Sequence, residues 1–230
     1  MSGGPRRVCG VCGAPAPAPF RAPPPEIAPD LDMRPGEPAR STLPNWIRTC
    51  RSCKAAAPDL SRMPDGAAAV VRGAAYGALD EAMPRPVVPF LRWALICHET
   101  GNAREQAEAL LQAAWAADDE PAPDAARDLR LQVAALWDGI AAPETALRRL
   151  DVLRRAGALD AARRLAEALA DVPMDDTARS VLRFQTARIG AGDTGRHLIS
   201  SALPPPAVAP HVTHVQQRKP GLFARLLGRG

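Results

Sequence analysis

Two CxxC pairs constrain the fold of this chain more than any other feature of its sequence. Cys9 and Cys12 stand near the start, and Cys50 and Cys53 repeat the same spacing after 37 intervening residues. Two such pairs can supply four thiolates to a tetrahedral Zn2+ ion, with each pair forming a turn around its own sulfurs. The spacing therefore predicts a small metal module in which the two pairs meet.

Sequence alone leaves three alternatives to zinc open. Iron in a rubredoxin-like site needs the same four ligands. A thioredoxin-type redox pair would follow a strand and open a helix, whereas both pairs here lie in Pro- and Gly-rich or extended sequence. The thiols could also stand together without a metal. Zinc is the interpretation that the spacing favours.

Basic side chains flank the four cysteines. A Zn(Cys)4 centre has a formal charge of −2, so nearby cations are expected for structural reasons alone. The alternative is that they contact the phosphates of a nucleic acid. We expect the single aromatics Phe20 and Trp46 to pack over the metal lobe rather than to stack on bases. The flanking cations are Arg6, Arg7, Arg48, Arg51 and Lys54.

The net charge of +4 is unevenly distributed. Residues 1–62 carry +4, residues 63–193 carry −5 and residues 194–230 carry +5. An acidic middle argues against a broad basic groove along the protein. No apolar signal region follows Met1 and no stretch approaches 18 uninterrupted apolar residues, so we expect a cytoplasmic protein. In the cytoplasm CxxC pairs serve metal or redox chemistry rather than structural disulfides.

The middle of the chain predicts a mainly α protein. It is rich in Ala, Leu and Arg, and apolar residues recur at helical spacing from about residue 65. We expect six or seven helices near residues 66–190, either as an irregular α-helical bundle or as an array of TPR-like helical hairpins. The predicted parts are residues 1–62, the metal module with a Pro-rich insertion; 63–193, the helical domain; and 194–230, a Pro-rich linker and basic amphipathic tail.

Several stretches together resemble an uncharacterised bacterial family. They are the two CxxC knuckles, "DLDMRP" (residues 30–35), "RSTLPNWIRTCRSC" (40–53), "APDLS" (57–61) and "AAWAADD" (113–119). The resemblance covers most of residues 8 to about 190 and implies an N-terminal zinc-ribbon-like motif followed by tetratricopeptide-like helices. It implies no activity. Lys54 stands where glycine commonly follows the last ligand, a departure that bears on the affinity of the second knuckle.

Few residues outside the knuckles suggest chemistry. Cys97 and His98 fall on an apolar helix and are interpreted as a packed thiol and a solvent-edge imidazole. The acids at 118–120 end a helix; we favour a solvated helix end over a cation- or arginine-binding spot. No Ser, His and Asp set, phosphate-binding loop or HExxH motif occurs. We therefore expect no enzymatic activity.

The tail combines apolar and basic residues. Leu222, Phe223, Leu226 and Leu227 would share one face of a short helix, which suggests weak contact with an anionic membrane or an acidic partner. His211 and His214 alone cannot define a metal site. The function we expect is a non-enzymatic, zinc-binding scaffold for protein or peptide partners. The alternatives are a nucleic-acid-binding regulator that uses the basic knuckles and a metal-dependent enzyme.

Overall fold

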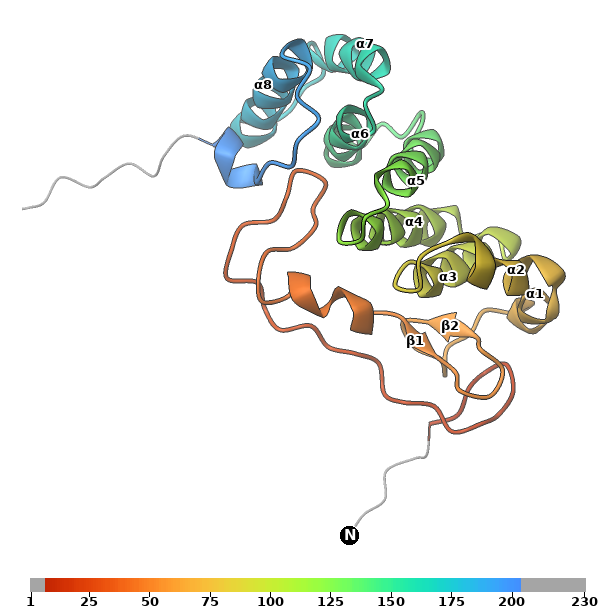
Figure 1. Cartoon of the computed structure of the whole chain (residues 1–230). Helices are drawn as coiled ribbons and strands as arrows, with labels where there is room; N and C mark the ends of the chain where they lie inside the picture. Colours follow the sequence, from red (N-terminus) through yellow and green to blue (C-terminus); the bar gives the residue numbers. More distant parts are fainter. Residues whose placement is uncertain (1–6, 204–230) are drawn as a thin grey trace, which may run out of the picture.

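A computed structural model describes residues 7–203, apart from the side chains of residues 80–82, and is mainly helical. It confirms the predicted fold class. A small lobe near the N-terminus precedes the helices (Figure 1), and it holds Cys9, Cys12, Cys50 and Cys53. The elements are η1 (Arg40–Asn45), β1 (Arg48–Thr49), β2 (Ala56–Ala57), α1 (Ala67–Arg72), α2 (Ala74–Ala82), α3 (Val88–Glu99), α4 (Ala103–Asp118), α5 (Pro123–Leu136), α6 (Pro143–Arg155), α7 (Leu159–Leu169), α8 (Asp176–Gly190) and η2 (Ile199–Ala202).

The helices begin and end where local chemistry dictates. Asn102 caps α4 by accepting a hydrogen bond from the backbone N–H of Glu105, and Asp175 caps α8 in the same way through Ala178. Proline occupies the first turn of α3, α5 and α6, where its missing N–H costs nothing. The described residues contain eight α-helices rather than the expected six or seven, because Gly73, in extended conformation, divides the first helical stretch into α1 and α2.

The core is built largely from α3, α4 and α5. The buried face of α4 is rich in alanine, which lets its neighbours approach closely, and Leu111 and Trp115 fill the remaining space. Consecutive helices pack against each other from α3 to α8 and follow an arc (Figure 1). Among residues 7–203, no helix combines the length and the apolar character needed to cross a membrane.

The stretch between the first knuckle and η1 runs along the inner side of this arc (Figure 1). Its residues 29–31 pair with the segment that follows α8: Leu31 donates a backbone hydrogen bond to His197, and Ile199 donates one to Pro29. Asp30 and Leu198 form an isolated antiparallel bridge. Contacts therefore cross the boundary expected near residue 62, and the division of the chain into three parts stays a prediction.

Candidate metal centre

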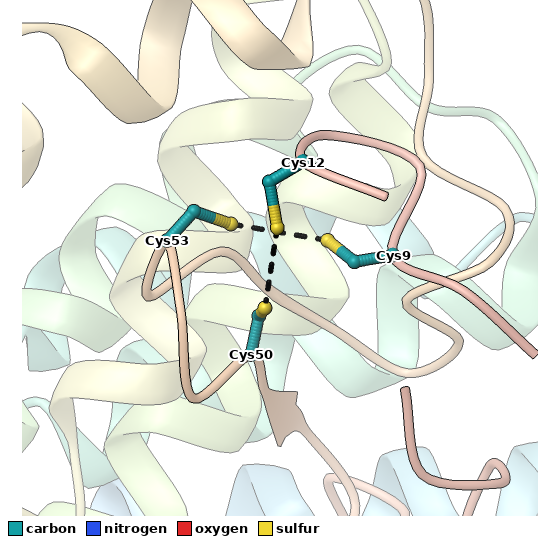
Figure 2. Close-up of side chains that lie close together, drawn as sticks. All are labelled: Cys9, Cys12, Cys50 and Cys53. Carbon is teal, nitrogen blue, oxygen red and sulfur yellow. Dashed lines mark hydrogen bonds between the residues drawn. The ribbon is translucent and has the colours of Figure 1, made fainter. Parts of the chain in front are cut away.

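The first knuckle is a tight turn held by its own backbone. The Cys9 N–H donates to the Ala14 carbonyl at 2.8 Å, and the Gly13 N–H donates to the Cys9 carbonyl at 2.8 Å. Gly13 has a φ of 70°, a left-handed conformation that glycine adopts without steric cost. These bonds place the sulfurs of Cys9 and Cys12 on the same side of the turn (Figure 2).

The second knuckle repeats this geometry without the glycine. The Cys50 N–H donates to the Ala55 carbonyl at 2.8 Å, and the Lys54 N–H donates to the Cys50 carbonyl at 3.0 Å. Lys54 takes a φ of 63°, the conformation of Gly13 in the first knuckle. A side chain in this region of φ/ψ space costs about 1–2 kcal/mol. The second knuckle thus forms the same turn at a conformational cost that the first one avoids.

The four sulfurs point toward one another (Figure 2) and all lie within 4.8 Å of each other. The Sγ atoms of Cys9 and Cys53 are 3.8 Å apart, and those of Cys12 and Cys50 are 3.7 Å apart. Thiolates bound at about 2.3 Å to a tetrahedral ion stand about 3.8 Å from one another, whereas disulfide sulfurs are about 2.05 Å apart. The spacing therefore fits four ligands around one metal ion.

The two knuckles are joined by contacts outside the cysteines. The Gly10 N–H donates to the Leu60 carbonyl at 2.8 Å, and a Cβ at Gly10 would lie 3.2 Å from the Cβ of Met63. The Tyr76 hydroxyl of α2 donates to the Lys54 carbonyl at 3.1 Å. The first knuckle is thus held against the stretch after the second one, and α2 holds the second knuckle.

A strand of alanines separates the cysteine cluster from the helices. Ala55, Ala56 and Ala57 are each 0% exposed. Because side chains alternate along a strand, Ala55 and Ala57 pack with Cys9 and Cys50, while Ala56 belongs to the helical core. Only small side chains fit between the two layers.

Trp93 of α3 packs over the metal lobe, together with Met63 and Val11. We expected Trp46 in this role, but Trp46 packs against the helical core and makes an edge contact with Trp115 at 6.5 Å between ring centroids. The other expected residue, Phe20, is half-buried beside a surface hollow. The sequence did not indicate that Trp93 covers the knuckles, because only the packing of α3 on β2 brings its ring there.

Burial and hydrogen bonding shift the pKa values of the four-cysteine cluster in opposite directions. The Ala14 backbone N–H donates toward Cys12 and, with the neighbouring thiols, lowers the pKa of exposed Cys12 to about 7. Burial raises the pKa of Cys53 to about 12 and also raises the pKa of Cys9. A bound divalent ion would favour the thiolate form of the buried cysteines as well, because a coordinating thiol is deprotonated. The four residues could hold Zn2+, and iron would use the same ligands.

The other sequence candidates lie outside this cluster. Cys97 is 1% exposed, and burial raises the pKa of its thiol to about 12, as expected for a packed, inert cysteine. His98 is exposed in the last turn of α3. His211, His214 and the apolar tail residues lie outside the described part of the chain.

The favoured interpretation of Asp118 and Asp119 as a solvated helix end is wrong. Two N–H groups of Arg130 contact the Asp118 carboxylate, one of them at 2.9 Å, and Arg155 reaches it at 2.7 Å. Asp119 binds Arg34 from the N-terminal segment. Two of the three acids at 118–120, Asp118 and Asp119, therefore bind arginines, the alternative that the dipole argument had suggested.

One buried acid, Asp32, was missed as a key residue. Its side chain is 0% exposed and accepts hydrogen bonds from the indole N–H of Trp115 at 2.8 Å and from Arg155 at 2.9 Å. The backbone N–H of Arg34 donates to the same carboxylate at 3.2 Å. These bonds attach residues 30–34 to α4 and α6. In the sequence, the alternation of acid and leucine in "DLD" could have indicated that this segment packs against the protein.

No protein-family model, curated protein or solved structure matches this chain. Of the resemblance described above, the structure confirms the clustering of Cys9, Cys12, Cys50 and Cys53. The structure itself therefore establishes a mainly helical fold and a possible four-cysteine metal site.

Proposed function

We propose that this chain is a non-enzymatic, zinc-binding scaffold for protein partners. The observation that supports it best is the cysteine cluster, in which four sulfurs lie within 4.8 Å of one another. Four thiolates complete a tetrahedral shell, so a bound Zn2+ would keep no position for water or substrate. Such an ion stabilises a fold rather than performing a reaction, and we propose no catalytic role.

The position of the cluster supports a structural role. Cys9 and Cys50 pack on the alanine strand, whose opposite face belongs to the helical core. A metal ion at this site would hold both knuckles against α3 and orient the metal lobe relative to the helices. The spacing of the two CxxC pairs favours Zn2+ as the bound ion, although a four-thiolate set also suits iron.

The inner side of the helical arc is an unsuitable surface for a peptide partner in this conformation. Residues 30–34 already lie there, with Asp32 bonded to Trp115 and Arg155 and with Arg34 bonded to the Trp115 carbonyl at 3.1 Å. We therefore propose that partners bind elsewhere on the protein, outside the groove that a helical-hairpin array would ordinarily offer.

Native mass spectrometry with elemental analysis tests the metal. We expect one zinc ion per chain, lost in the Cys50→Ser, Cys53→Ser double variant and kept in Cys97→Ser, the matched control. Stoichiometric iron in place of zinc would show that the bound ion is iron. Absence of any metal, or its retention in the double variant, would contradict the site.

Cross-linking in the source cells, followed by reconstitution with purified components, tests the scaffold role. We expect a protein that binds the metal-loaded chain and not the double variant. Binding of DNA or RNA that weakens steeply with salt and is lost on replacement of Arg48, Arg51 and Lys54 would favour the nucleic-acid-binding regulator instead.

A further inference from the structure

Two adjacent hollows lie on the surface of the metal lobe. The first has a volume of about 740 Å³ and lies between residues 14–17 and the stretch that contains β1 and the second knuckle. The second has a volume of about 460 Å³ and is lined by residues 18–21 and Arg7. Arg48 lines both, so we call the combined surface the Arg48 groove. None of the arginine side chains that line it is a metal ligand or a partner of Asp32 or Asp118.

The Arg48 groove is strongly cationic. Four arginines line it and no acidic residue does; they are Arg7, Arg21, Arg48 and Arg51. Of these four arginines, Arg7 alone forms an ion pair within residues 7–203, with Asp59 at 3.4 Å. The Nε atom of Arg48 is buried and has no hydrogen-bond partner among these residues. Uncompensated guanidinium groups around one hollow attract an anionic ligand and suit carboxylates in particular.

One free strand edge borders the groove. The sheet that the structure describes consists of β1 and β2 alone. Cys50 donates to the Ala55 carbonyl, so these two residues form a hydrogen-bonded pair, and the adjacent pair of Thr49 and Ala56 is the non-hydrogen-bonded type. The N–H and C=O of Thr49 therefore face away from β2. Thr49 is exposed and lines the first hollow.

We propose that the Arg48 groove binds an extended acidic peptide segment of a partner protein, which pairs with the β1 edge at Thr49. The inference rests on the proposed scaffold function and names its partner chemistry. Backbone bonds at Thr49 would hold the peptide, and its carboxylates would reach Arg21, Arg48 and Arg51. A nucleic acid fits less well, because Phe20 is the one aromatic residue lining the two hollows, and bases would have no further ring on which to stack.

Fluorescence anisotropy with the full, metal-loaded chain tests this proposal. The probe is a labelled peptide of alternating glutamate and valine. Its controls are a lysine–valine peptide, a glutamate–proline peptide whose glutamate nitrogens are methylated so that no backbone N–H remains to donate, and a single-stranded oligonucleotide of equal charge. The variant is Arg21→Ala, Arg51→Ala. Its matched control is Arg62→Ala, Arg72→Ala, which removes two exposed cations outside the groove. Metal content is checked in each variant.

We expect the glutamate–valine peptide to bind, the double groove variant to weaken its binding roughly tenfold, and the control variant to change it less than about twofold. The lysine–valine and glutamate–proline peptides should bind at least roughly tenfold more weakly. Equal binding of the glutamate–proline peptide would overturn strand pairing. Tighter binding of the oligonucleotide, lost in the groove variant, would make a polynucleotide the occupant. No binding of any anionic probe overturns the site.

Failure of this inference is distinguishable from failure of the scaffold role. A reconstituted protein partner whose affinity is unchanged by Arg21→Ala, Arg51→Ala would leave the scaffold standing and place its surface elsewhere. Absence of a protein partner, together with intact binding of the acidic peptide in the groove, would remove the scaffold role and leave a peptide-binding module.

Discussion

At the scale of single residues, the two knuckles place different residue types at one position with a left-handed backbone conformation. Gly13 and Lys54 occupy equivalent places after the second cysteine of each pair, with φ values of 70° and 63°. Each donates its N–H to the carbonyl of the first cysteine in its pair. Glycine adopts this conformation freely and lysine does not. The second knuckle therefore keeps the hydrogen bond of the first while carrying the strain of a Cβ atom.

Replacement of Lys54 by glycine should strengthen the second knuckle. We expect Lys54→Gly to exceed Lys54→Ala in stability by about 1 kcal/mol, because both lose the Nζ contact to the Arg51 carbonyl but only glycine relieves the strain. Gly13→Ala should cost a similar amount in the first knuckle. Competition for zinc with a chelator and thermal unfolding measure both. Equal stability of the glycine and alanine variants would show that Lys54 is unstrained.

Asp118 should contribute stability that depends on pH. Burial alone would raise the pKa of its carboxyl, but the bonds from Arg130 and Arg155 outweigh this effect and lower the pKa below 3.8. A carboxyl with a lowered pKa stabilises the folded state above its unfolded pKa, and this contribution is lost as the pH falls through the folded pKa. The free energy of unfolding of the wild type should therefore exceed that of Asp118→Asn near pH 6, and the difference should narrow below about pH 4.

Urea unfolding followed by helical circular dichroism, in wild type and variant at several pH values, measures this difference. Asp128→Asn is the control, because its side chain is 59% exposed and its one ion pair in the described part of the chain is with exposed Arg127 at 3.3 Å. A difference for Asp118→Asn that stays constant from pH 6 to pH 3 would contradict the prediction.

At the scale of elements, β2 separates the cysteine cluster from the helical core. Its alanines lie between the cysteine cluster on one face and α3 on the other, and all are fully buried. The strand pairs with β1 through the register Arg48 with Ala57 and Thr49 with Ala56. Small side chains at these positions set the distance between the metal lobe and the helices.

A larger side chain in β2 should separate the two layers. We expect Ala56→Leu to destabilise the protein by about 1–3 kcal/mol through overpacking against α3. Ala168→Leu, at an exposed position of α7, is the control and should change stability by less than about 0.5 kcal/mol. Chemical denaturation compares the two. If Ala56→Leu proved as mild as the control, the close packing of β2 on α3 would be wrong.

At the scale of the whole molecule, buried charge pairs connect distant parts of the chain. Asp32 and Arg34 bind α4 and α6, and Arg154 donates to the carbonyls of Asp193 and Gly195 at 2.6 and 2.8 Å. These contacts close the N-terminal segment and the C-terminal end of the described chain around the helices. The helical arc is therefore held from its inner side by polar bonds as well as by its apolar core.

Loss of the Asp32 charge should weaken this closure. We expect Asp32→Asn to destabilise the protein by about 1–3 kcal/mol, because Arg155 and Trp115 would each lose a charged acceptor in a buried site while Arg155 keeps its bond to Asp118. Asp128→Asn serves again as the exposed control. Hydrogen exchange should rise in residues 29–34 and 196–199 together. Unchanged exchange in both segments would show that Asp32 does not join them.

The sequence by itself determined the cysteine cluster and the helical class. Both are local signals: the CxxC spacing forms a turn within four residues, and the apolar periodicity of α3–α8 depends on neighbours three or four positions away. Only the tertiary structure decided that Trp93 covers the metal lobe and that Asp118 and Asp119 bind arginines. It also decided that residues 30–34 fill the inner side of the arc. Asp32 and Trp115 are 83 residues apart, and Arg34 and Asp119 are 85 apart. Pairing at such distances depends on how the helices stack, because a charged side chain carries no sequence mark of the partner that the folded chain will bring to it.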